Sequence, residues 1–121
     1  MNYLKLFLIL FLFGSLLMAI PERGLQSRVS AQNKNKITIS NNKFEPKKLT
    51  VTEGTTVVWE NTQGAHTVKS DTGAFISKTL SAGDKFEYQF NTAGSYPYHC
   101  TFHGNTGGSA MSGTIVVTKK K

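Results

Sequence analysis

The chain of 121 residues has a single cysteine, so no disulfide can form within it. Charged residues make up 17% of the sequence and apolar residues 39%, a balance found neither in disordered acidic segments nor in coiled coils. No window of about a dozen residues repeats its apolar positions with the 3.6-residue period of a helix. The length and these absences predict one domain with little helix, at most a short turn near residues 74–78.

Arginine is missing from residue 32 onward, although that part of the chain is basic, with eleven lysines against six acidic residues and a net charge of +5. A basic surface by itself suits a nucleic acid or an anionic membrane. Here no dense basic run precedes Lys119–Lys121, and arginine, the residue that most often reads bases, is absent. We therefore expect no nucleic-acid binding.

The N-terminal segment carries one early charge, Lys5, ahead of an almost unbroken apolar run over residues 6–20. This run has the length of a signal-peptide core and is short for a membrane span of about 20 residues. We predict a signal peptide over 1–31, cleaved after the small side chain of Ala31, and one domain over 32–121. The alternative is an uncleaved anchor, the one means of membrane contact that we expect. Both readings export the domain to the periplasm or another extracytoplasmic face.

Short segments with alternating apolar and polar residues fill the rest of the chain, separated by clusters of Gly, Asp, Asn and Thr. Such alternation is the period-two signature of half-buried strands. The segments are 36–40, 49–52, 55–60, 85–90, 96–100 and 113–118. Six short strands in about ninety residues predict an all-β fold, a Greek-key antiparallel β-sandwich. Its expected core includes the aromatic residues Trp59, Phe86, Tyr88, Phe90 and Tyr96.

Four candidate metal ligands lie toward the C-terminal half. Cys100, His103 and Met111 fall within twelve residues, and His66 follows the strand that contains Trp59. A thiolate, two imidazoles and a weak thioether suit copper in an electron-transfer site, because sulfur stabilises Cu(I) and imidazole also suits Cu(II). Cysteine and histidine suit zinc as well, so that alternative stays open.

Each of these residues has an ordinary explanation when taken alone. A histidine in a turn is commonly solvated, and a buried cysteine or methionine commonly fills a core. In an exported protein, however, an unpaired thiol needs a reason, and metal coordination is one. His99 is different, because strand alternation points it away from Cys100. We expect His99 to be a surface or structural residue.

The stretch from residue 57 to 117 resembles the cupredoxin family of small blue copper proteins, which includes the plastocyanin and azurin types. The matching motifs are VVWEN at 57–61, AHTV at 65–68, GSYPYHCTFH at 94–103 and MSGTIVV at 111–117. The run Tyr-His-Cys-Thr is most similar to amicyanin- and halocyanin-type members. The resemblance implies an eight-strand Greek-key sandwich with one copper ion. It also implies the ligands, which are His66, Cys100, His103 and Met111.

Two features depart from the family pattern. Thr67 follows the first ligand histidine where the family often has an asparagine that bonds across to the ligand loop. We expect the threonine hydroxyl and a backbone amide to replace that bond. The glycine-rich segment 104–110, between His103 and Met111, is longer than in related proteins. Either the extra residues loop out and leave Met111 in place, or they loosen its axial ligation.

These observations predict a one-electron carrier and not an enzyme, since no acid is evident that could orient a Cys100–His103 nucleophile pair. The alternative is a copper delivery or storage module, which the scarcity of methionine disfavours. We expect a monomer whose redox partners present an acidic docking face to its lysines. Docking is expected at a small apolar patch around His103, formed by Gly64, Ala65, Phe75, Phe102 and Gly104.

Overall fold

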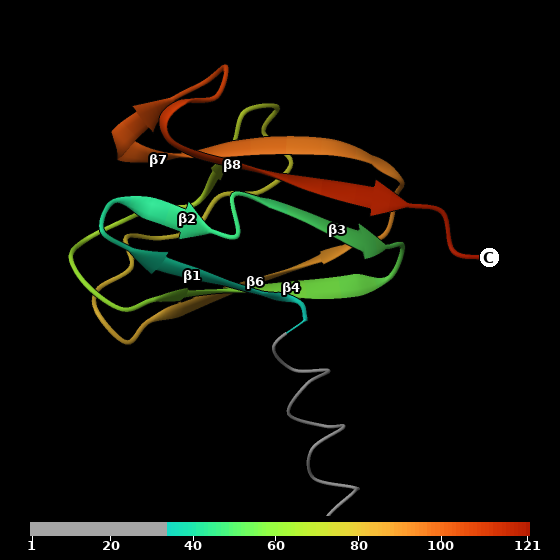
Figure 1. Ribbon diagram of the computed structural model, residues 1–121, viewed down its shortest axis with the longest axis horizontal. Helices are drawn as coiled ribbons and strands as arrows, with labels where there is room; N and C mark the ends of the chain where they lie inside the picture. Colours follow the sequence, from blue (N-terminus) through green and yellow to red (C-terminus); the bar gives the residue numbers. More distant parts are fainter. Residues whose placement is uncertain (1–33) are drawn as a thin grey trace, which may run out of the picture. The chain divides into compact units, whose positions relative to one another are not determined.

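The computed structural model describes residues 34–121, which form eight strands (Figure 1). They are β1 (Lys36–Ser40), β2 (Lys43–Glu45), β3 (Lys48–Thr52), β4 (Thr55–Asn61), β5 (Lys69–Ser70), β6 (Lys85–Phe90), β7 (Gly94–Asn105) and β8 (Ser109–Thr118). No helix occurs within 34–121, so this part of the chain has none that could span a membrane. The predicted signal peptide over 1–31 lies outside the described residues and stays a prediction.

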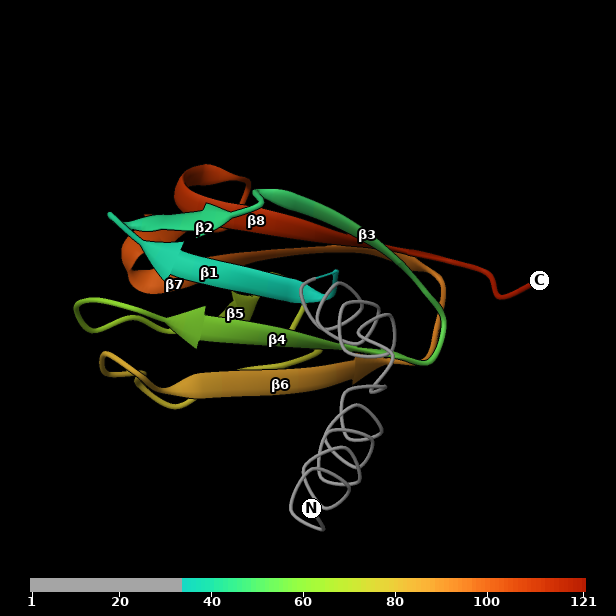
Figure 2. The same ribbon diagram turned by 60° about the horizontal axis from the view of Figure 1, so that its bottom comes forward.

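The strands build two four-stranded sheets that face each other as layers (Figures 1 and 2). The first has the order β2-β1-β4-β6, and the second has the order β3-β8-β7-β5. The all-β sandwich expected from the alternating sequence is confirmed. Two strands escaped the prediction, β2 and β5, because segments of three and two residues are too short to show a period of two.

The sheets are mixed, which corrects the expectation of purely antiparallel pairing. β1 runs parallel to β4, and β3 runs parallel to β8, while the other four strand pairs are antiparallel. The chain passes from β2 in one sheet to β3 in the other through residues 46–47 without forming a hairpin. It therefore reverses only twice between β1 and β4, and these neighbours point the same way.

Aromatic side chains fill the space between the sheets. Trp59 is fully buried, and its ring lies 5.5–6.3 Å from four other rings, those of Phe75, Phe86, Phe90 and Tyr98. Phe90 is buried as predicted, and Phe86, Tyr88 and Tyr96 are half-buried against the same cluster. Burial of each large apolar side chain contributes about 1.5–3 kcal/mol, so this cluster gives the loops between strands a rigid base.

Candidate metal centre

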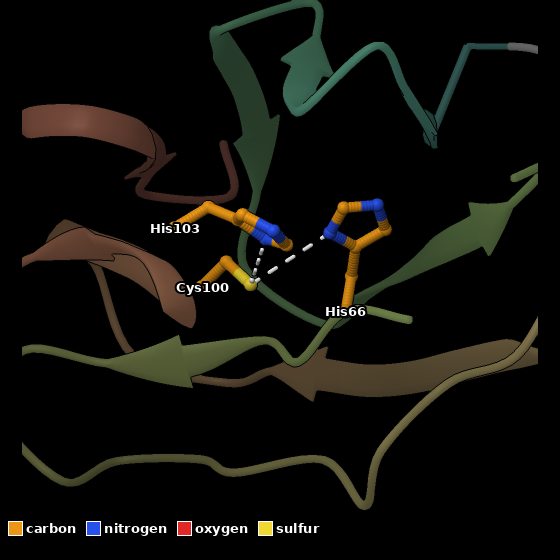
Figure 3. Close-up of side chains that lie close together, drawn as sticks. All are labelled: His66, Cys100 and His103. Carbon is orange, nitrogen blue, oxygen red and sulfur yellow. Dashed lines mark hydrogen bonds between the residues drawn. The ribbon is translucent and has the colours of Figure 1, made fainter. Parts of the chain in front are cut away.

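Three side chains predicted as ligands converge at one end of the sandwich (Figure 3). The Cys100 Sγ atom lies 3.8 Å from His66 Nδ1 and 3.6 Å from His103 Nδ1. One potential ligand atom from each of the three residues falls within 4.8 Å of the others. His66 and Cys100 are 34 positions apart in the sequence, and the pairing of β5 with β7, just after His66 and just before Cys100, brings their segments together.

An irregularity in the β7–β8 pairing orients Cys100 and His103. His99 pairs with Ser112, and the next pair is Gly104 with Ala110. Four residues of β7, Cys100 to His103, therefore lie opposite one residue of β8, Met111. Extra residues on one strand re-aim side chains at such bulges. Here the bulge lets Cys100 and His103, three positions apart, turn toward the same point.

The segment that carries His66 is fixed by its backbone and by a buried amide. His66 and Leu80 exchange two backbone hydrogen bonds, of 3.1 Å and 2.7 Å. The Asn61 side chain, fully buried, donates to the carbonyls of Gly64 and Leu80 at 2.7 Å and 3.0 Å. Asn61 was not singled out from the sequence, although its place between a strand and a glycine turn is typical of such a role.

Thr67 connects the two ligand segments, as expected from its position. Its backbone N–H lies 3.5 Å from Cys100 Sγ, and its hydroxyl oxygen accepts a 2.8 Å hydrogen bond from the backbone N–H of Thr101. The hydroxyls of Thr67 and Thr101 are also 2.8 Å apart. A hydroxyl and a backbone amide thus make the cross-connection predicted in place of an asparagine. Hydrogen bonds to a ligating sulfur tune its electron donation.

The three converging residues differ in their exposure to solvent. Cys100 and His66 are 0% and 2% exposed, whereas His103 lies at the surface. The pKa of His66 is lowered, first by burial and then by repulsion from His103, with a partial opposite effect from a hydrogen bond to the Gln63 backbone. A lowered pKa keeps the His66 imidazole neutral, which is the form that binds a metal.

Met111, the fourth predicted ligand, lies at the point where the chain re-enters the core. Its side chain is 3% exposed and belongs to the buried core cluster. A Cβ atom added to Gly104 would lie 2.2 Å from the Met111 carbonyl oxygen and 3.3 Å from the Cys100 carbonyl oxygen. The backbones of Gly104, Met111 and Cys100 are thus packed together, and the ligand role of Met111 stays a prediction.

The glycine-rich segment 104–110 forms the end of a hairpin. Gly104 pairs with Ala110 and Asn105 pairs with Ser109, so β7 and β8 continue beyond the bulge. Gly107 and Gly108 have φ angles of 87° and 82°, a conformation that glycine adopts readily. The extra residues therefore extend outward as a hairpin, and Met111 keeps its place in the core.

Near the site, the structure corrects the expectation for Phe75 and decides between the two alternatives for His99. Phe75, expected in the exposed patch around His103, is 5% exposed and packs against Trp59, so that expectation was wrong. A bridge between Lys69 and Ile76 fixes this part of the chain and turns Phe75 inward. His99 is buried and lies 2.6 Å from the Asp71 carboxylate, which fits the structural alternative.

The observed spacing suits a shared metal ion. Bonds of about 2.05 Å to nitrogen and about 2.3 Å to sulfur, as for zinc, separate the two ligand atoms by roughly 3.5 Å in tetrahedral geometry and roughly 3.8 Å in trigonal geometry. The sulfur–nitrogen distances of 3.6 Å and 3.8 Å fall within this range. The donor set of one thiol and two imidazoles is part of what copper electron-transfer sites use, and the thioether of Met111 is the predicted fourth donor.

Comparisons with known proteins place this fold in a known family. A family model described as a cupredoxin-like domain matches residues 6–117. Plastocyanin from Scenedesmus fuscus is 35% identical over 86 residues, a match that covers 61% of this chain and 85% of the plastocyanin.

Solved structures show the same similarity. An oxidised mutant of amicyanin aligns with a TM-score of 0.63 and 27% identity over 71% of this chain and 83% of its own. A copper-containing nitrite reductase from Thermus scotoductus aligns with a TM-score of 0.61 and 25% identity over 71% of this chain, but over only 22% of the enzyme. The fold is therefore shared with part of an enzyme as well as with small proteins of similar size. This chain belongs to the cupredoxin family.

Proposed function

We propose that the protein is a type 1 (blue) mononuclear copper protein that carries single electrons between redox partners outside the cytoplasm. His66, Cys100, His103 and Met111 would hold one copper ion per chain. The observation that carries the proposal is the approach of one cysteine sulfur to two histidine Nδ1 atoms, at 3.6 Å and 3.8 Å, inside a cupredoxin sandwich. The export that it requires rests on the predicted signal peptide.

The donor set favours copper over zinc as the working metal. When bound here, copper would supply one-electron chemistry between Cu(I) and Cu(II), which zinc lacks. The protein contributes a rigid set of ligands: Asn61 and Leu80 hold the His66 segment, and the β7 bulge holds Cys100 and His103. Ligands that stay in place keep the rearrangement between oxidation states small, which favours fast electron transfer.

The exposure of His103 supports a route for electrons through its imidazole. Phe102, 56% exposed, lies beside it, with 6.4 Å between the ring centroids. Gly64 and Ala65 are exposed as well. The docking patch that we propose consists of Gly64, Ala65, Phe102, His103 and the half-buried Gly104. By contrast, the complete burial of Cys100 prevents a substrate from reaching its sulfur, which supports a carrier rather than an enzyme.

Partners with an acidic face fit the charge of the domain. Lysines are exposed at several places along the chain, at positions 47, 48, 69, 78 and 85. We expect the bimolecular rate of electron transfer with an acidic redox protein to fall clearly between about 10 mM and 500 mM salt, because salt screens long-range attraction. Stopped-flow measurements across that range provide the test. A rate that is flat or rises with salt would contradict the acidic partner and leave the copper site untouched.

Optical and EPR spectra of the purified, copper-loaded protein test the central proposal. We expect an intense visible thiolate-to-copper band in the oxidised form, which disappears on addition of one electron per copper. Cys100→Ser is the control that should abolish this band, because a hydroxyl is a harder and weaker donor than a thiolate. Stoichiometric copper binding without the band, or the same band in Cys100→Ser, would refute the proposal.

A further inference from the structure

The tip of the β7–β8 hairpin is attached to the sandwich by a single carboxylate. Asp71 Oδ2 accepts a 3.0 Å hydrogen bond from the backbone N–H of Gly107, in the hairpin turn. Asp71 Oδ1 accepts a 2.6 Å hydrogen bond from His99 Nδ1. One side chain therefore connects the residue before Cys100 with the turn that separates His103 from Met111.

The backbone of Asp71 is itself fixed to β7. Its N–H donates to the Pro97 carbonyl at 2.9 Å, directly after β5 pairs with β7 through Lys69 and His99. The side chains of Asp71 and His99 are only 11% and 8% exposed. A carboxylate with so little solvent contact is costly unless donors satisfy it, and both of its oxygens have one.

A long segment between two ligands has much conformational freedom, and the hydrogen bonds of Asp71 restrict it. Seven residues, 104–110, separate His103 from Met111, and a free segment of that length would sample many conformations. Asp71 restrains the segment at its far tip, 36 residues away in the sequence. Since both hydrogen bonds fall on the strand and hairpin that carry Cys100, His103 and Met111, restraint of the tip also restrains those residues.

We propose that Asp71 is a positioning residue of the copper site: by binding His99 and Gly107 together, it holds the hairpin and thereby the positions of His103 and Met111. The proposal rests on the copper function proposed above. Asp71 touches none of the four ligands and acts only through the segment that carries them. A short ligand loop is restrained by its own length. In this longer hairpin, Asp71 supplies the restraint instead.

Asp84 offers a matched control. Its carboxylate also accepts a backbone hydrogen bond, from Ser81 at 2.9 Å, but within its own turn and away from the ligand segment 100–111. Both carboxylates thus stabilise a turn, and of the two only that of Asp71 joins segments that are distant in the sequence. The backbone bond that the Asp84 carbonyl accepts from Asn61 stays in place in Asp84→Ala. An effect common to Asp71→Ala and Asp84→Ala would reflect a general loss of turn stability, whereas an effect of Asp71→Ala alone would reflect the hairpin.

The experiment compares the full protein with Asp71→Ala, Asp71→Asn and Asp84→Ala in two measurements. Amide hydrogen exchange of residues 104–110 is measured without metal. We expect exchange to become about tenfold faster or more in Asp71→Ala, because two hydrogen bonds to a charged group are lost. Asp71→Asn, which keeps one acceptor oxygen, should fall between, and Asp84→Ala should match the unchanged protein.

The second measurement follows the copper-loaded proteins by EPR, reduction potential and electron self-exchange rate. We expect Asp71→Ala to show a changed spectrum and potential and a slower self-exchange, with Asp84→Ala unchanged. Unchanged hairpin exchange in Asp71→Ala would overturn the proposal, and so would faster exchange with identical copper properties. Failure of the copper function itself would appear separately, as the absence of a charge-transfer band in the protein without substitutions.

Discussion

Two segments bring ligands to the site, and they are held in different ways. The His66 segment is short and is fixed from both sides by a backbone bridge to Leu80 and by the buried Asn61 amide. The segment from Cys100 to Met111 is a bulge followed by a hairpin, fixed by Thr67 at its start, by close backbone packing at Gly104 and by Asp71 at its tip. The first relies on buried hydrogen bonds at its own turn, and the second on steric fit together with hydrogen bonds from distant parts of the sequence.

Because the two segments are held in different ways, substitutions in them should have different consequences. Loss of a buried hydrogen bond leaves unsatisfied groups but little displacement of the chain. A steric clash with backbone atoms, by contrast, forces the chain to move, and here the moving chain carries two or three ligands. The His66 segment should therefore tolerate substitution better than the hairpin base.

Gly104→Ala is expected to have the largest effect. The added methyl would lie 2.2 Å from the Met111 carbonyl oxygen, and no flexible side chain can move aside there. We expect a loss of stability of about 2–3 kcal/mol or more, together with a changed copper spectrum. Thermal unfolding and EPR measure the two effects.

The control for Gly104→Ala is Gly83→Ala. Gly83 has a φ of 91° with nothing within 4 Å of the added atom, so its substitution introduces backbone strain alone, of about 1–2 kcal/mol. The copper spectrum should stay unchanged in this variant. If Gly104→Ala kept the original spectrum as well, the close packing at the hairpin base would have no part in ligand placement.

Asn61→Ala should have the next largest effect. It removes the two hydrogen bonds that the buried amide donates, to Gly64 and Leu80, and a longer one of 3.4 Å that it accepts from the Gln63 N–H, at a cost of about 2 kcal/mol. We expect weaker copper binding but a charge-transfer band of unchanged energy, since the His66–Leu80 bridge remains. Gln63→Ala changes the same loop as Asn61→Ala but removes only an exposed side-chain hydrogen bond to Asn41 in the β1–β2 turn, so it should cost less than about 0.5 kcal/mol.

Residue type and order in the sequence were enough to predict the candidate ligands, because thiol, imidazole and thioether groups are few in this chain. The supporting residues Asn61, Asp71 and Thr101 escaped, because nothing local in the sequence distinguishes them from the other polar residues of the chain. Their partners are 19, 36 and 34 positions away, beyond any local pattern. Long-range pairing, which the sequence does not display, therefore decides which polar residues support the site.

Strand direction and the burial of Phe75 also depend on long-range pairing and could not be predicted from local sequence. Alternation located six of the eight strands, but a period of two is the same in either direction, so the parallel pairs were missed. Phe75 was expected at the surface, as part of the apolar patch around His103. The hydrogen bonds between Ser70 and Phe75 and between Ser77 and Val68 draw this segment against β5 and turn its ring into the core.

Met111→Leu tests whether the segment from Cys100 to Met111 supplies a third ligand, at the point where the hairpin returns to the core. If the thioether is the axial ligand, leucine should raise the reduction potential, since loss of a weak donor disfavours Cu(II) and added apolar surface excludes water. Leucine has a similar volume, so stability should change by less than about 1.5 kcal/mol. An unchanged potential and EPR spectrum would show that Met111 does not bind the metal.

The smallest expected effect is a pH dependence of stability that arises from His66. Burial and the nearby His103 lower the pKa of folded His66, so below the ordinary value of 6.5 the unfolded chain binds its proton more readily than the folded one. Stability of the metal-free protein should therefore rise with pH between the lowered pKa and about 6.5. Glu60, whose pKa is lowered chiefly by a hydrogen bond from Lys36, loses its stabilising effect only as the pH falls below 4.5 and lies outside this window.

Urea unfolding of metal-free protein from pH 5 to 8 measures the slope, and His66→Gln should flatten it. The same slope in His66→Gln would assign the effect to another group, and bound metal should shift the window to lower pH, because it competes with the proton for the same imidazole.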